Sequence, residues 1–74
     1  MRLRLTVERE AKGWSRAELA RRAKMQPADV GKIEAGRVQP YPSQLRKLAK
    51  ALRVSTPETL LEAVYSERGA NDAA

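Results

Sequence analysis

The hydrophobic residues of this chain fall into short segments, and most of these segments have the spacing of a helix face. The clearest lies within residues 43–52, where Leu45, Leu48, Ala49 and Leu52 follow the i, i+3, i+4, i+7 pattern. Lysine and arginine fill the opposite side of that segment. The pattern predicts an amphipathic helix whose apolar face packs on a core.

Two shorter helices are predicted upstream of this segment. Ser15 and Glu18 have the Ser-x-x-Glu spacing of a capping box, which predicts a helix that ends near residue 24. Pro27 suits the first position of the next helix, because its missing N–H group would have no partner there. We expect this helix to end at about Ala35, before Gly36.

The first residues allow two interpretations. Leu3, Leu5 and Val7 alternate with polar residues, as in a strand, but a helical series runs through the same segment: Leu3, Val7, Ala11 and Trp14. We favour a helix that ends near Lys12, with the first few residues extended. Gly13 follows where a helix commonly takes a left-handed residue.

A fifth helix is predicted after residue 55. Thr56 and Pro57 have the character of a cap and a first helical residue. The apolar stripe that follows consists of Leu60, Leu61, Val64 and Tyr65. We therefore expect one domain over residues 1–66 and a flexible tail over residues 67–74, where small and polar residues prevail.

Composition narrows the possible functions. The 74 residues include no cysteine and no histidine, which removes thiolate chemistry, the commonest general base and the commonest metal ligand. We expect no enzymatic activity, no cofactor and no metal. No apolar run has the length of a membrane span, and a cytoplasmic, nucleoid-associated protein is expected. The net charge of +6 favours a polyanionic partner, with nucleic acid as the first candidate.

The order of these features resembles the lambda repressor/Cro-type helix-turn-helix domain, or XRE family. The residues that carry the resemblance are Lys12-Gly-Trp-Ser-Arg-Ala-Glu-Leu-Ala, Ile33-Glu-Ala-Gly36, Pro40 and Leu45-Arg-Lys-Leu-Ala-Lys-Ala-Leu-Arg-Val54. It covers about residues 3–64. It implies an all-α, five-helix fold that binds duplex DNA and regulates transcription, with the third helix in the major groove. The chain departs from the family at Arg16, at Lys24, which replaces the glycine of the turn, and at Arg53.

The resemblance also implies a set of candidate DNA-binding residues. If Val30, Ile33 and Glu34 face inward, the helical period places Lys32 outward as the only long side chain, among small residues. A contact of Lys32 with a base and a contact with a phosphate are both open. Arg16 lies at a helix start that attracts phosphate. The full set is Ser15, Arg16, Gln26, Pro27, Ala28, Asp29, Gly31, Lys32, Arg37, Gln39 and Tyr41.

Other residues are assigned to architecture. Family members often have an arginine in the first helix that pairs with the glutamate of the Ile-Glu-x-Gly motif. The resemblance therefore implies a pair of Arg9 with Glu34, which would fix the first helix against the third. Trp14 is expected in the core rather than stacked on a base. Gly31 is explained equally well by close approach to DNA and by close packing against the second helix. A homodimer interface is possible at Leu61, Val64 and Tyr65.

Two other functions compete with specific DNA binding. The small outward face of the third helix would also suit a protein-interaction module that docks on a toxin, a sigma factor or another regulator. The basic charge would serve a sequence-neutral architectural DNA binder as well. Salt-dependent binding to duplex DNA separates the interaction module from both DNA-binding functions.

Overall fold

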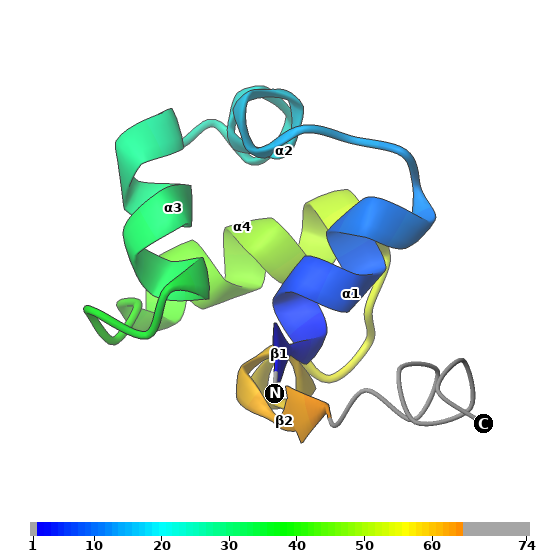
Figure 1. Cartoon of the computed structure of the whole chain (residues 1–74), viewed down its shortest axis with the longest axis vertical. Helices are drawn as coiled ribbons and strands as arrows, with labels where there is room; N and C mark the ends of the chain where they lie inside the picture. Colours follow the sequence, from blue (N-terminus) through cyan, green and yellow to red (C-terminus); the bar gives the residue numbers. More distant parts are fainter. Residues whose placement is uncertain (1, 65–74) are drawn as a thin grey trace, which may run out of the picture.

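The computed structural model describes residues 2–64, and this part of the chain is mainly α-helical (Figure 1). The elements in chain order are β1 (Arg2–Leu3), α1 (Arg4–Ala11), α2 (Arg16–Ala23), α3 (Pro27–Glu34), α4 (Pro42–Leu52), the 3-10 helix η1 (Pro57–Leu61) and β2 (Ala63–Val64). The all-α class expected from the hydrophobic pattern is confirmed. Within the described residues there are four α-helices, not five.

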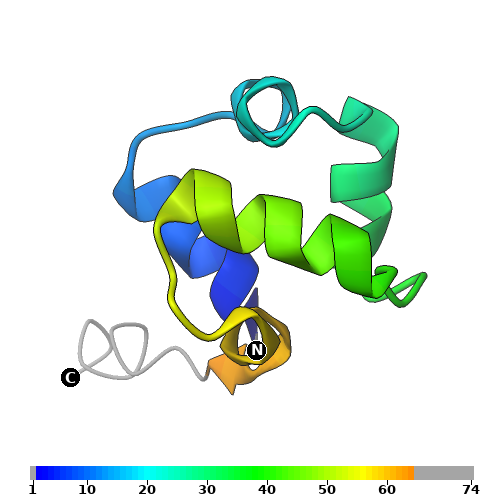
Figure 2. The same ribbon diagram turned by 180° about the vertical axis from the view of Figure 1, so that it is seen from behind.

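The core forms around α4, which lies in the middle of the molecule with α2 across one side and η1 on the other (Figures 1 and 2). Every helix contributes at least one side chain that solvent does not reach. The largest of these buried side chains are Leu5, Leu19, Val30, Ile33, Leu48 and Leu60. The apolar face predicted for α4 is the one that packs on this core, since Leu45, Leu48, Ala49 and Leu52 are all buried.

All four α-helices end in the same hydrogen-bonded turn, in which a left-handed residue follows the helix and the next N–H bonds five residues back. After α1 and α3 the left-handed residue is a glycine, Gly13 with φ 72° and Gly36 with φ 75°. After α2 and α4 it is a cation, Lys24 with φ 57° and Arg53 with φ 59°. The positive φ anticipated for Lys24 is therefore present, and Arg53 shares it.

The predicted fifth helix is present only in part: Thr56 is at the cap position and Pro57 is the first residue, as expected, but no α-helix follows in the described residues. The segment after Thr56 is a 3-10 helix of five residues, and the chain then extends into β2. β2 pairs antiparallel with β1, with Arg2 opposite Val64, and the N–H of Arg4 donates to the carbonyl of Glu62 at 2.8 Å. These hydrogen bonds satisfy the N–H and C=O groups of the backbone after η1, which a longer helix would otherwise satisfy. Pairing with the chain start explains why the first residues are extended, as expected.

The predicted flexible tail over residues 67–74 lies outside the described residues. Over residues 2–64, the helices are too short or too polar for any of them to cross a membrane.

The two left-handed cations lead to a stability prediction. A side chain in the left-handed region costs free energy that glycine avoids, so Lys24→Gly should be more stable than Lys24→Ala by about 0.5–1 kcal/mol. The comparison removes the same charge in both variants and isolates the backbone term. Arg53→Gly against Arg53→Ala should behave alike. Urea unfolding followed by circular dichroism measures both differences, and a more stable alanine variant would contradict the prediction.

Candidate nucleic-acid interface

Helix α3 has one buried side and one exposed side. Val30 and Ile33 are buried in the core, and the side chain of Glu34 is only 1% exposed. The exposed side is formed by residues that are small apart from one lysine: Pro27, Ala28, Lys32 and Ala35. The helical register deduced from the sequence is the one that the structure has, and Lys32 extends from the exposed side.

The buried carboxylate of Glu34 joins α3 to α1. Arg9 Nε donates to Glu34 Oε2 at 2.8 Å, and Arg9 Nη2 donates to Glu34 Oε1 at 3.1 Å. The third nitrogen, Nη1, donates to the carbonyl of Trp14 at 2.8 Å, in the connection that leads to α2. The two side chains expected to pair are thus in bidentate contact, and the pair also holds the α1–α2 connection.

Arg16 brings the start of α2 to the same carboxylate. Its Nε donates to Glu34 Oε1 at 3.1 Å, while its side chain stays 59% exposed. Just before it, Ser15 Oγ accepts from the N–H of Glu18 at 3.0 Å and caps the helix, which is half of the predicted capping box. The carboxylate of Glu18 accepts from Arg21 and Arg22 instead. The start of α2, with its exposed guanidinium, is therefore fixed relative to α3.

Glu18 has a second role on the surface of α2. Hydrogen bonds from Arg21 and then from Arg22 hold the pKa of Glu18 below its ordinary value. These contacts neutralise part of the positive charge on α2. Lys32 and Arg37, by contrast, have no carboxylate within salt-bridge distance among residues 2–64. The described acidic residues therefore do not neutralise these two charges.

The loop after α3 and the exposed side of that helix form a small hollow of about 200 Å³. It brings together four of the candidate residues: Asp29, Lys32, Gln39 and Tyr41. Tyr41 is 71% exposed, and its backbone N–H donates to Gln44 Oε1 at 2.9 Å, which fixes the loop at the start of α4.

The other candidates lie around this hollow or apart from it. Gln26 and Pro27 are exposed where α3 begins, with Gln26 at the cap position. Arg37 borders an adjoining hollow beside Leu61. Ile33, Val38 and Gln39 line both hollows. Sequence reasoning overlooked Val38 and Gln44, which also line the first hollow. The exposure of Val38, at 46%, had no signal in the sequence beyond its place between two loop residues.

Gly31 has open space around it. A Cβ atom built on Gly31 would meet no other atom within 4 Å, so the glycine is not required for packing against α2. The structure therefore argues against the packing explanation for this residue.

The proposed dimer residues are partly accounted for by the fold. Leu61 is half-buried against the core, and Val64 is half-buried in β2. Tyr65 lies outside the described residues. Trp14 is half-buried and packs against the core, with Lys12 and Arg22 beside its ring. No group of three or more potential metal-ligating side chains occurs within the described part of the chain.

The geometry defines a domain in which two helices joined by a tight turn present the exposed side of the second. A family model described as a helix-turn-helix domain matches residues 1–63, and the chain belongs to that family. This membership is consistent with the resemblance to lambda repressor-like domains and supports a DNA-binding regulator. Comparison with curated proteins and with solved structures gave no match.

The buried ion pair leads to the second prediction. Glu34→Ala should lower the free energy of unfolding by about 3–5 kcal/mol, because it leaves the buried Arg9 without a counter-charge. Arg16→Ala should cost less than about 1 kcal/mol, since that side chain is mostly exposed. The double variant Arg9→Met with Glu34→Leu should cost less than Glu34→Ala alone. Urea unfolding measures all three variants, and an unchanged stability in Glu34→Ala would contradict the assigned role.

Proposed function

We propose that this protein is a sequence-specific regulator of transcription that binds duplex DNA through α3 in the major groove. The observation that carries the proposal is the exposed side of α3, which lies beside the exposed start of α2 in a helix-turn-helix domain. Small residues on that side permit close approach to base edges, and Lys32 supplies a donor for guanine. No cofactor is needed for this contact.

The surrounding residues suit the DNA backbone. Arg16 stands at a helix start, where free N–H groups and the helix dipole favour phosphate. Arg37, Gln39 and Tyr41 are exposed in the loop after α3 and could donate to phosphate oxygens. Such contacts orient the domain on the duplex, whereas base contacts select the sequence.

We also propose that two copies bind together, through Leu61, Val64 and Tyr65, on half-sites about 34 Å apart. A regulator of this kind would be found with the nucleoid. Analytical ultracentrifugation with and without the DNA site tests the stoichiometry. A single copy on each isolated site would contradict the dimer and leave the DNA contact intact.

The third prediction separates base contacts from phosphate contacts. A duplex selected from random DNA and a scrambled duplex are titrated with the protein at several salt concentrations. Lys32→Ala should reduce the preference for the selected duplex over the scrambled duplex by about 1–3 kcal/mol. The loss should come from one or two base positions in each half-site. Arg37→Ala should weaken binding to both duplexes alike and lower the log–log salt slope by about one unit per site.

The same titrations can contradict the proposal. The affinity of the unmodified protein should fall steeply with salt, by about 0.9 log units per tenfold salt for each phosphate neutralised. Equal weakening of both duplexes by Lys32→Ala would make the lysine a phosphate contact. Absence of duplex binding at low salt would exclude DNA as the partner.

An interaction module for another protein is the second candidate function. The observation that favours it is the apolar character near α3, where Ala28 and Ala35 are accompanied by the exposed Val38 and Tyr41. Aromatic side chains of this kind are common at protein interfaces. Failure to bind DNA in the titrations above would leave this function as the better explanation of the same surface.

Gly31 provides the fourth prediction. Gly31→Ala should raise the free energy of unfolding by about 1 kcal/mol, since alanine favours a helix and the added methyl group meets open space. The same methyl group should weaken binding to the selected duplex if the backbone of α3 lies close to the DNA. Urea unfolding and DNA titration are compared on one variant. Unchanged DNA affinity in a stabilised variant would show that α3 does not approach the DNA closely at this residue.

A further inference from the structure

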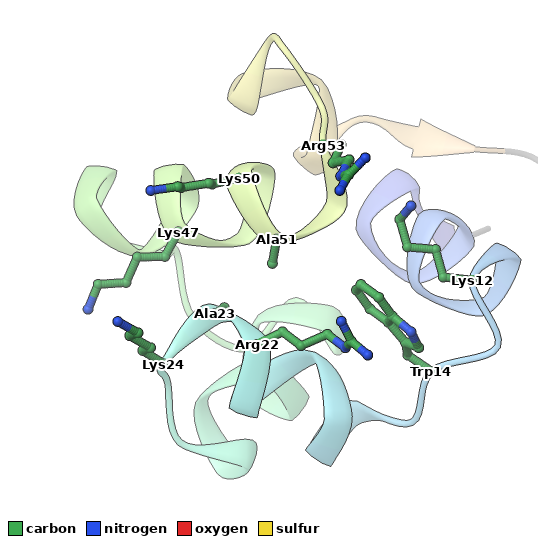
Figure 3. Close-up of a pocket in the computed structure, with 9 residues that line it drawn as sticks. All are labelled: Lys12, Trp14, Arg22, Ala23, Lys24, Lys47, Lys50, Ala51 and Arg53. Carbon is green, nitrogen blue, oxygen red and sulfur yellow. The ribbon is translucent and has the colours of Figure 1, made fainter.

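A second basic surface lies away from Lys32 and Arg37, between the carboxyl ends of α2 and α4 and the connection after α1 (Figure 3). It is an open pocket of about 640 Å³, called here the basic pocket. Six of the residues that line it are cations and none is acidic. The cations are Lys12, Arg22, Lys24, Lys47, Lys50 and Arg53, and the other lining residues are Trp14, Ala23 and Ala51. A volume of this size is typical of sites for small molecules.

Most cations of the basic pocket have no counter-charge in the part of the chain that the structure describes. Among residues 2–64, only one of the six, Arg22, forms a salt bridge, with Glu18. The arginines elsewhere on α1 and α2 are all paired, and Glu8, Glu10, Glu34 and Glu62 form their salt bridges outside the pocket. Five cations without a partner among residues 2–64 surround one volume and repel each other, and an anion placed among them relieves that repulsion.

Two of these cations occupy strained backbone positions. Lys24 and Arg53 are the only non-glycine residues with positive φ among the described residues, and both line the basic pocket. At the equivalent ends of α1 and α3 the chain has Gly13 and Gly36. The negative end of a helix dipole attracts cations, but residues within the last turn satisfy that attraction without strain. Strain kept at such positions points to a function for the side chain.

The arrangement of the side chains shows what kind of ligand fits. Lys24, Lys47 and Lys50 lie on one side of the basic pocket, while Lys12, Arg22 and Arg53 lie on the other with Trp14 (Figure 3). Two small residues, Ala23 and Ala51, lie between the two groups. A ligand with two separated negative charges could therefore lie over Ala23 and Ala51 and contact the cations on both sides of the pocket.

Trp14 supports the cations rather than a ligand ring. Arg22 Cζ lies 4.3 Å from the centroid of the ring, and Lys12 Nζ lies 5.5 Å from it. Both distances are within the range of a cation–π contact. Because two cations already occupy the ring, recognition in the basic pocket depends on charge and not on stacking.

We propose that the basic pocket binds a compact polyphosphate anion, with phosphate groups that bridge the two cationic groups. The polyphosphate could be inorganic or part of a nucleotide, since the pocket addresses the phosphates alone. The cations converge on one concavity instead of following a line, which favours a compact anion over the backbone of a duplex. The basic pocket adjoins the start of α3, since Lys24 and Lys47 also line a small hollow with Gln26 and Asp29. The proposal does not rest on DNA binding, and the variants below test whether the two sites act separately.

The test is isothermal titration calorimetry of the full chain with sodium tripolyphosphate and with ATP, at low salt and without divalent metal. The fluorescence of Trp14, the only tryptophan of the chain, is recorded in parallel. We expect saturable binding of one anion per chain, with a change in fluorescence as Lys12 and Arg22 move on the ring. Similar affinities for both anions would identify the phosphates alone as the ligand, and a much tighter binding of ATP would add the nucleoside.

Lys24→Gly and Arg53→Gly are the decisive variants, because each removes a cation while it relieves backbone strain. Both variants should remain folded, and thermal melts will verify this. A loss of binding then reports the loss of the cation. Each should bind tripolyphosphate at least about three- to fivefold more weakly than the unmodified chain. Arg46→Ala is the matched control, since it removes an exposed cation of α4 that does not line the basic pocket. The control should bind as the unmodified chain does.

Three results would overturn the proposal. The first is no saturable binding of either anion up to about 1 mM at about 50 mM salt, well below the screening of physiological conditions. The second is equal weakening by Arg46→Ala, which would show unspecific attraction to net charge. The third is a loss of duplex DNA affinity in Lys24→Gly and Arg53→Gly that matches their loss of tripolyphosphate binding, which would make the basic pocket part of the DNA interface. Failure of DNA binding with retained tripolyphosphate binding would affect only the proposed function.

Discussion

The structure depends on one buried carboxylate, that of Glu34. It is almost fully removed from water, and a charge in that position is tolerable only with a matched counter-charge and satisfied hydrogen bonds. Arg9 provides both from α1, through a bidentate contact that fixes direction as well as distance. Because the same guanidinium also holds the carbonyl of Trp14, a single pair sets the angle of α3 and the path into α2.

This constraint explains how a helix of eight residues can present a defined surface. A helix of that length has little stability of its own, so its orientation must come from tertiary contacts. Val30 and Ile33 anchor the middle and Glu34 anchors the end, which leaves the exposed side free of structural duties. Arg16 then links the same carboxylate to the start of α2. The two elements proposed to contact DNA are thus held together from the inside.

Much of this arrangement could be predicted from the sequence, because it rests on local signals. The capping box at Ser15, the proline at the start of α3 and the spacing on α4 each define an element within a few residues. The resemblance supplied the pairing of Arg9 with Glu34, which no local pattern gives. The end of the chain was mispredicted for the opposite reason. A threonine–proline start and an apolar stripe fit a helix, but β2 forms because Val64 pairs with Arg2, about sixty residues away.

The basic pocket escaped prediction because its residues look ordinary one at a time. Lys47 and Lys50 have the spacing expected on the solvent-exposed side of an amphipathic helix. Arg53 is, in the sequence, only a departure from the family. Only the fold brings them together with Lys12 and Lys24 around one volume.

The net charge of the chain therefore does not measure the charge offered to DNA. Part of it is neutralised on α1 and α2, and part is gathered at the carboxyl ends of α2 and α4. Lys32 and Arg37, on the side of α3, hold only a small share. The neighbours of each surface set its charge, and for that reason we propose a different anion for each.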